Sequence, residues 1–333
     1  MRFIALTKSA AIGLCLNAAT FTVQADNHST ATTTLATQAP PAGFTLPRTE
    51  VFTLRDPSSG RNYQIAVQRP KDSSRLATAP QVYLLDSPYA FPIVTGAIRF
   101  PVGSGTMEDA LVIGVGFAEG DRGQASRVRD YTPTEDKDWK LATGGAAAHA
   151  DFIEKTLFPE ISRRYLAQAT VTDSQVTAST TSQSASAGTP SAPRRIFIGN
   201  SLGGLFGGWL IQARPVLFDD YILGSPSVWF DDESLLTTSL VRDTAADQGA
   251  TNAATDKPTP NRVFIAVGAR EFPPQQQHDM VAGARKLKAR LEALPGRQIE
   301  LKYLEIPEAD HGMAFPTTAI HGLTWLLGHS NND

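Results

Sequence analysis

The sequence predicts an α/β fold: a single domain with a mostly parallel central sheet flanked by helices. Short continuous runs of Val, Ile and Leu alternate with longer amphipathic segments. This alternation is typical of strands buried on both faces of a parallel sheet, with helices packed against them. One apolar run leads directly into a glycine-rich turn and then a helical pattern. With 333 residues, 41% of them hydrophobic, the chain is long enough for one large core.

The start of the chain has the pattern of a secretory signal. Within residues 1–25, two basic residues precede an apolar stretch, and Val-Gln-Ala ends the segment. This is the order of a signal peptide with its cleavage site. We therefore expect cleavage after Ala25 and a periplasmic or extracellular protein; a buried N-terminal helix is the alternative. Cys15 is the only cysteine, so the mature chain is expected to lack disulfide and thiol chemistry.

The predicted elements follow in order after a polar, low-complexity leader at 26–42. The domain is expected over 43–329 and starts with a hairpin of strands 50–56 and 62–70. Further strands are predicted at 81–86, 109–117, 194–200, 219–227, 262–269 and 299–307. Amphipathic spacing predicts helices at 144–166, 203–215, 277–294 and 316–329.

Two segments interrupt this alternation. Residues 168–193 and 243–260 are polar and have too few apolar residues to pack. We expect both to be disordered insertions within one domain, because a boundary at 168–193 would separate a helix from the strand that follows it. No apolar stretch after the signal is long enough for a membrane span.

The glycine-rich turn, Gly199-Asn200-Ser201-Leu202-Gly203, has the form G-x-S-x-G between a strand and a helix. In a nucleophile elbow this turn lifts the serine hydroxyl above the sheet, and glycines two residues before and after it avoid collisions. We expect Ser201 to be a nucleophile and the backbone N–H of Leu202, at the helix start, to stabilise an oxyanion. A purely structural glycine turn is the alternative.

Six blocks carry a resemblance to a known family. They are VYLLDS (82–87), RVRDYTPT (127–134), GGAAAHADFIEKTLFPEISRRY (144–165), GNSLGGLFGGWLI (199–211), LGSPSVWF (223–230) and EADHGMAFP (308–316). In this order they resemble esterases of the α/β-hydrolase fold, in the branch of enterobactin- and bacillibactin-type siderophore esterases. RDYTPT followed by the GGA helix is the most specific sign, because G-x-S-x-G is common to α/β-hydrolases. The two polar insertions depart from the family pattern.

A serine nucleophile needs a base and a group that orients the base. His311 follows the last strand in a short loop before the last helix, where an α/β-hydrolase histidine belongs in chain order. Glu271 follows the preceding strand and is the expected acid; Asp279 and Asp310 are alternatives. The resemblance also allows a Ser–His pair without a third member, with Glu271 free to bind its neighbour Arg270 or water.

The second oxyanion donor is expected after strand 81–86. The family usually has Asp-Gly there, whereas this chain has Asp86-Ser87-Pro88. Because Pro88 has no N–H, the backbone of Ser87 is the expected donor.

Two further residues are candidates for substrate binding. Arg129 matches the RVRDYTPT block, and the resemblance implies that its charge would favour an anionic, catecholate-type substrate. A salt bridge with Asp130 or Glu135 is the alternative. Trp229 and Phe230 are candidates for the acyl pocket, with core packing as the alternative.

Together these observations predict a secreted serine ester hydrolase that forms an acyl-enzyme. The resemblance implies siderophore trilactones or related carboxylic esters as substrates. An acyltransferase of the same fold, or a binding protein on a hydrolase scaffold, is the alternative. No cofactor or metal is expected, because no His/Cys/Asp/Glu cluster has metal-ligand spacing. The net charge of −3 and the absence of a basic patch give no support for a nucleic-acid partner.

Overall fold

The computed structural model describes residues 45–166, 192–237 and 261–329. The signal expected at 1–25 and the leader expected at 26–42 lie outside these residues. So do the expected insertions, apart from Ala192 and Pro193. These assignments therefore stay predictions. Among the helices of the described segments, none is both long and apolar enough to cross a membrane.

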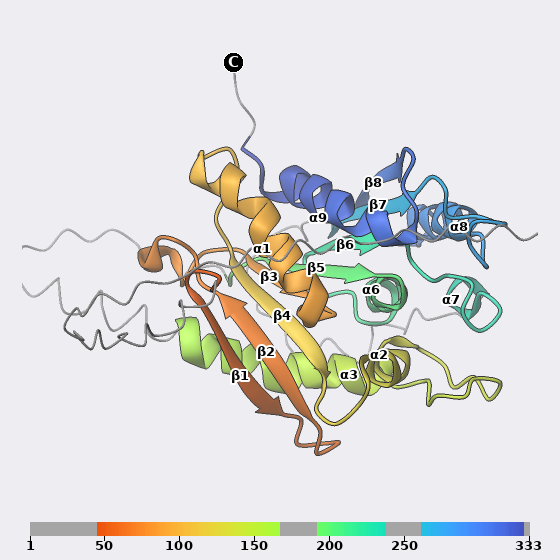
Figure 1. The fold of residues 1–333 in the computed structure, drawn as a ribbon, viewed down its shortest axis with the longest axis horizontal. Coiled ribbons are helices and arrows are strands. Elements are labelled where there is room, and N and C mark those ends of the chain that lie inside the picture. The colour runs from red at the N-terminus through yellow and green to blue at the C-terminus, as the bar shows by residue number, and fades with distance from the viewer. Residues whose placement is uncertain (1–44, 167–191, 238–260, 330–333) are drawn as a thin grey trace, which may run out of the picture. The chain divides into compact units, whose positions relative to one another are not determined.

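The described chain forms one eight-stranded sheet (Figure 1). Its strands are β1 (Thr49–Arg55), β2 (Asn62–Gln68), β3 (Gln81–Leu84), β4 (Leu111–Ala118), β5 (Arg195–Asn200), β6 (Asp220–Gly224), β7 (Asn261–Gly268) and β8 (Ile299–Ile306). They lie in the order β1-β2-β4-β3-β5-β6-β7-β8. β2 is antiparallel to both of its neighbours, and all other pairs are parallel. The predicted hairpin and mostly parallel sheet are confirmed.

Helices cover both faces of this sheet. They are α1 (Ser87–Gly103), α2 (Gly123–Tyr131), α3 (Ala146–Phe152), α4 (Phe158–Ile161), α6 (Leu202–Ala213), α7 (Ser234–Thr237), α8 (Met280–Glu292) and α9 (His311–Leu327), with the 3₁₀-helical η1 (Ser73–Arg75) and the π-helical η2 (Ile153–Leu157) and η3 (Ser162–Leu166). Figure 1 shows α1 and α9 on one side and α3 and α6 on the other. Each face has its own apolar cluster, one built with α1 and α9, the other with α2, α3, α6 and α8.

The predicted helix over 144–166 is a continuous helical run. α3, η2, α4 and η3 follow one another without a break from Ala146 to Leu166. Its apolar side chains, at the spacing of an amphipathic helix, are buried against the sheet. These buried residues are Phe152, Ile153, Leu157, Ile161 and Tyr165.

The helices differ from the prediction in two ways. α1, α2 and α7 were not predicted; in α1, Pro92 and Pro101 interrupt the sequence, and proline is unfavourable inside helices. α9 begins at His311 rather than at 316, so His311 lies in the first helical turn and not in a loop. The cause is Asp310, whose side chain accepts the backbone N–H of Met313 and caps the helix.

The parallel register brings the carboxyl ends of six strands, β3 to β8, to one edge of the sheet. Leu84 of β3 pairs with Ile198 of β5, and Asn200 of β5 pairs with Gly224 of β6. β7 and β8 continue in the same direction. β3 lies between β4 on one side and β5 on the other, so the order in which the strands follow one another reverses direction here. Ligands of open α/β sheets bind at such a point, outside the carboxyl ends of the strands.

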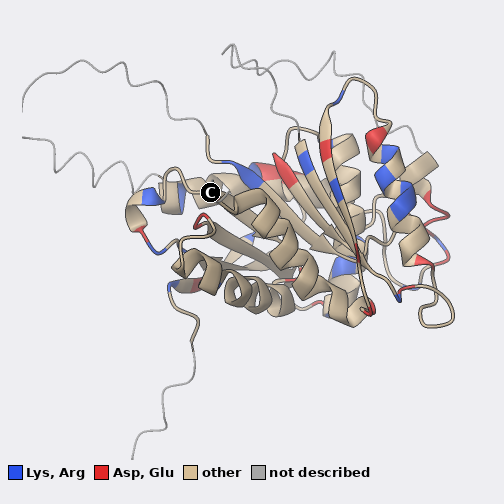
Figure 2. Ribbon diagram, turned by 90° about the horizontal axis from the view of Figure 1, so that it is seen from above, with Lys and Arg blue, Asp and Glu red and all other residues tan. Residues whose placement is uncertain are grey.

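Charged residues of opposite sign lie close to one another in the described segments (Figure 2). Many of them form ion pairs across the structure, such as Arg285 with Glu305, Lys286 with Glu233, and Arg262 with Asp220.

Candidate active site

The glycine-rich turn connects β5 to α6 and holds Ser201 in an unusual backbone conformation. Ser201 has φ 59° and ψ −118°, a region that residues other than glycine rarely adopt. A Cβ atom on Gly199 would lie 2.3 Å from the carbonyl oxygen of Gly203, so this position requires glycine. Gly203 differs from the expectation, because a Cβ there would make only ordinary contacts of 3.5 Å or more. The backbone of Gly203 therefore leaves no room for a side chain on Gly199, whereas position 203 itself has room for one.

His311 and Glu271 form a hydrogen-bonded pair. Nδ1 of His311, at the start of α9, lies 2.5 Å from Oε2 of Glu271, which follows β7. Glu271 is buried, and its Oε1 accepts hydrogen bonds from the hydroxyl of Ser225 at 2.6 Å and the backbone N–H of Gly268 at 2.7 Å. Because Nδ1 is engaged by the carboxylate, Nε2 is the ring nitrogen left for a substrate or nucleophile.

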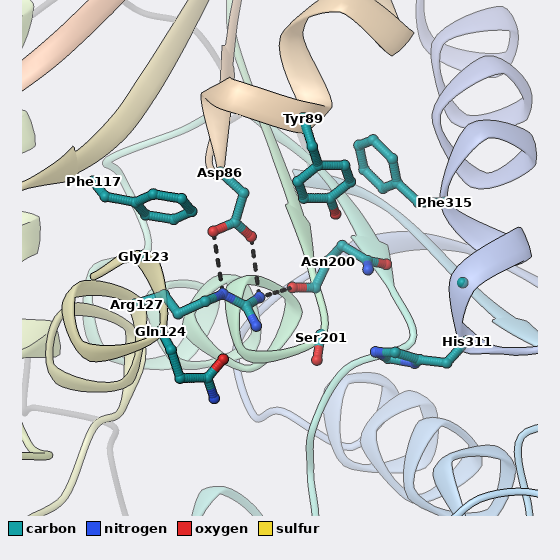
Figure 3. Close-up of a pocket in the computed structure, with 11 residues that line it drawn as sticks. Asp86, Tyr89, Phe117, Gly123, Gln124, Arg127, Asn200, Ser201, His311 and Phe315 are labelled. Atoms are coloured by element: carbon teal, nitrogen blue, oxygen red, sulfur yellow. Dashed lines mark hydrogen bonds and ion pairs between the residues drawn. The ribbon is translucent and has the colours of Figure 1, made fainter. Parts of the chain in front are cut away.

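Ser201 and His311 line the same cavity, which has a volume of about 410 Å³. Figure 3 shows the imidazole of His311 pointing toward Ser201. The other lining residues are Asp86, Tyr89, Phe117, Gly123, Gln124, Arg127, Asn200, Gly312 and Phe315. The cavity therefore combines three aromatic side chains with a serine–histidine pair at one side.

Asp86 and Arg127 form an ion pair in the cavity that the sequence analysis missed (Figure 3). Arg127 Nε and Nη2 donate to the two oxygens of Asp86 at 3.2 and 3.1 Å, and Nη2 also donates to the backbone oxygen of Asn200 at 3.4 Å. Burial raises the pKa of Asp86, and the charge of Arg127 offsets part of that rise. Burial also raises the pKa of Tyr89 to about 12. The pair links the start of α1 to α2 and the nucleophile turn.

The two backbone groups expected to bind an oxyanion lie at helix starts. Leu202 is the first residue of α6 and Ser87 the first of α1. The first N–H groups of a helix have no partner within it, and they carry the positive end of the helix dipole. Neither residue lines the cavity itself, but each directly follows one that does, Ser201 and Asp86.

The predicted substrate-binding residues lie apart from the lining of this cavity. Arg129 donates to Asp121 and Asp130, which engage its guanidinium on both sides. Trp229 stacks on His278, with ring centroids 3.8 Å apart and planes within 5° of parallel. It also stacks, at 6.1 Å, on Trp139.

The two alternative acids have other roles in the structure. Asp279 caps α8 by accepting the backbone N–H of Ala282, and Asp310 caps α9. Arg270 pairs with Glu308 and not with Glu271. Among the described residues, no group of three or more His, Cys, Asp or Glu side chains is arranged to hold a metal ion.

The chain is similar in sequence to a protein named as a siderophore esterase and in fold to solved structures of siderophore hydrolases. The chain is 27% identical over 300 residues to a ferri-bacillibactin esterase of Bacillus subtilis, covering 85% of this chain and 91% of that protein. The crystal structure of a BES protein from Bacillus cereus has a TM-score of 0.66 at 24% identity, covering 88% of this chain and all of the other. A siderophore hydrolase from Aspergillus nidulans, EstB, has a TM-score of 0.65 at 20% identity, covering 88% and 99%. No protein-family model matches the chain.

These two structural likenesses are below 25% identity and establish the fold, while the Bacillus subtilis relative adds a likeness in sequence along nearly the whole of both chains. The described residues of this chain have the α/β-hydrolase fold, and the chain resembles proteins named as siderophore esterases in sequence.

Proposed function

We propose that this chain is a serine ester hydrolase in which Ser201, His311 and Glu271 form the catalytic triad. The proposal rests on how these three side chains are arranged. Ser201, on a strained strand-to-helix turn, lines one cavity with His311, and a buried carboxylate holds Nδ1 of that histidine at 2.5 Å. Nucleophile, orienting acid and base follow one another in this order along the chain, as they do in α/β-hydrolases.

In the proposed reaction, Oγ of Ser201 attacks the ester carbonyl carbon while Nε2 of His311 takes its proton. The backbone N–H groups of Leu202 and Ser87 stabilise the negative oxygen of the tetrahedral intermediate. The C–O bond to the alcohol then breaks, and His311 returns the proton to the leaving oxygen. Water, deprotonated by His311, attacks the acyl-enzyme carbonyl; the bond between the acyl carbon and Oγ of Ser201 breaks, and His311 returns the proton to Oγ, which releases the acid. The carboxylate of Glu271 accepts the hydrogen bond from Nδ1 of His311 and stabilises the imidazolium each time it forms.

The proposed substrate class is siderophore esters. The Bacillus subtilis relative is named as a ferri-bacillibactin esterase. The aromatic lining by Tyr89, Phe117 and Phe315 supports a flat or apolar group on the acyl side of the ester. Export from the cytoplasm, based on residues 1–25, remains part of the proposal.

The test compares the wild-type protein with Ser201→Ala on an ester panel that includes a ferric trilactone siderophore, with mass spectrometry of the products. The wild type should hydrolyse esters and react with a fluorophosphonate probe at Ser201, whereas Ser201→Ala should lose both while keeping its thermal unfolding curve. Adding an alcohol acceptor distinguishes hydrolysis from acyl transfer. Retention of ester turnover in Ser201→Ala would refute the proposal.

A further inference from the structure

The segment Ser225-Pro226-Ser227, directly after β6, contacts both ends of the proposed triad. The hydroxyl of Ser225 donates to Glu271 Oε1 at 2.6 Å, and the hydroxyl of Ser227 lies 3.2 Å from Oγ of Ser201. Both serines are buried, with exposed fractions of 0% and 1%. We propose that Ser225 is a positioning residue for the acid and that Ser227 orients the nucleophile. The inference rests on the proposed serine hydrolase function.

Backbone hydrogen bonds fasten this segment to the strands on either side. The N–H of Ser201 donates to Gly224 at 2.9 Å, and the N–H of Ser227 donates back to Ser201 at 3.1 Å. On the other side, the N–H of Ser225 donates to Ala266 of β7 at 2.7 Å. The segment therefore has a defined position relative to both the nucleophile turn and the strand that leads to Glu271.

The conformation of Ser225 indicates that its hydroxyl is used. Its φ is 39°, in the left-handed region where glycine would be free of strain. Strained residues of this kind concentrate at functional sites, where surrounding contacts maintain them. Here the maintained contact is a short hydrogen bond to a buried carboxylate.

Pro226 lies against the start of α6. A Cβ atom on Gly204 would be 3.0 Å from Cα of Pro226 and 2.8 Å from the carbonyl oxygen of Gly224. The first turn of the helix that carries the nucleophile is thus in direct contact with the segment. A proline at this place also limits backbone freedom between the two serines, because its ring fixes φ.

Ser225 determines which carboxylate oxygen of Glu271 faces the histidine. Oε1 is occupied by two donors, the hydroxyl of Ser225 and the N–H of Gly268, so Oε2 remains for Nδ1 of His311. This favours the tautomer with a proton on Nδ1 and a lone pair on Nε2, which is the form that can take the proton of Ser201.

Ser227 acts on the reacting atom itself. When Ser201 donates its proton toward His311, the hydrogen bond between the two serines requires Ser227 to be the donor. Ser201 Oγ then accepts from one side and donates to the other, which holds its hydroxyl in the direction needed for proton transfer. Without Ser227 the hydroxyl is free to rotate away.

The test uses Ser225→Ala and Ser227→Ala in the full-length protein, with Ser126→Ala as a matched control. Ser126 is a buried serine whose hydroxyl also contacts a carboxylate, Asp130, at 3.0 Å, outside the proposed triad. For each variant, kcat and KM are measured on a p-nitrophenyl ester, with active sites titrated by a fluorophosphonate so that only folded protein is counted.

Ser227→Ala should lower kcat by about 10- to 100-fold with KM within twofold, as expected for losing one oriented hydrogen bond at the reacting group. Ser225→Ala should lower kcat by about tenfold with KM within twofold. The reason is that Oε1 of Glu271 loses one of its two donors, so the carboxylate no longer holds Oε2 in a fixed position against Nδ1 of His311.

Two results separate this inference from the proposed function. If the wild type is active and Ser201→Ala is not, but both new variants keep kcat within threefold of Ser126→Ala, the positioning roles are wrong and the hydrolase proposal stands. If the wild type itself lacks ester turnover, the proposed function fails instead.

Discussion

Replacing Glu271 with glutamine tests how His311 is oriented. The side-chain oxygen of glutamine can still accept hydrogen bonds from Ser225 and Gly268, so its NH₂ group must face Nδ1 of His311. An amide donor at this place favours the tautomer with its proton on Nε2, which cannot accept the proton of Ser201. The substitution thus changes the tautomer while leaving the buried hydrogen bonds in place.

The expected loss is large. The corresponding Asp→Asn change in a Ser-His-Asp triad lowers kcat by about 10⁴-fold with geometry intact. We expect Glu271→Gln to lower kcat by roughly 10³- to 10⁴-fold, which corresponds to roughly 4–5.5 kcal/mol of transition-state stabilisation. KM should change little, because Glu271 does not line the cavity.

The assay is steady-state hydrolysis of a p-nitrophenyl ester, with thermal unfolding measured in parallel. Asp279→Asn is the control: it also removes one acid, but asparagine caps a helix as well as aspartate does. Its kcat and stability should match those of the wild type. If Glu271→Gln keeps more than a tenth of the wild-type kcat, His311 works without an orienting acid and the proposed triad is a pair.

Two predictions concern buried charge. Arg127→Met leaves the carboxylate of Asp86, whose side chain is 2% exposed, without its partner, and should lower the free energy of unfolding by about 3 kcal/mol in urea titrations. Asp86→Asn should cost less, because Arg127 is 19% exposed and retains water; equal losses would contradict this reasoning. Burial lowers the pKa of His149 from its ordinary value of 6.5. Below pH 6.5 the unfolded chain therefore binds a proton at this residue more readily than the folded protein does. The wild type should lose stability as the pH falls below 6.5. His149→Phe should be stabilised relative to the wild type by an amount that grows between pH 7 and pH 5 in thermal unfolding, and a difference that does not vary with pH would count against this.

The strands and the position of the serine could be predicted because their signals are local. Each buried strand is a short apolar run, and the elbow combines such a run with a glycine pattern. The parallel register then places Glu271 and His311 at the same sheet edge as Ser201, which is why chain order alone was enough to nominate them.

Arg127 could not be predicted as a cavity residue, because its position depends on α2, a helix that the sequence did not reveal. Without α2, the RVRDYTPT block gave no reason to prefer Arg127 over Arg129. On a helix, residues four apart share a face, and Gly123 and Arg127 both line the cavity. Arg129, two residues further, lies on another side and meets Asp121 and Asp130. The partner of Arg127, Asp86, is distant in sequence, so no local pattern could join them.

The parallel sheet places the reacting groups at one edge and the starts of the strands at the opposite edge. β5 begins at Arg195 and β7 at Asn261. Both points belong to the amino edge of the sheet, whereas Ser201, Glu271 and His311 follow the carboxyl ends of their strands. Additions of sequence at the amino edge are therefore a full strand length away from the reacting groups. We therefore expect the reaction to tolerate changes of sequence just before β5 and β7 better than changes just after these strands.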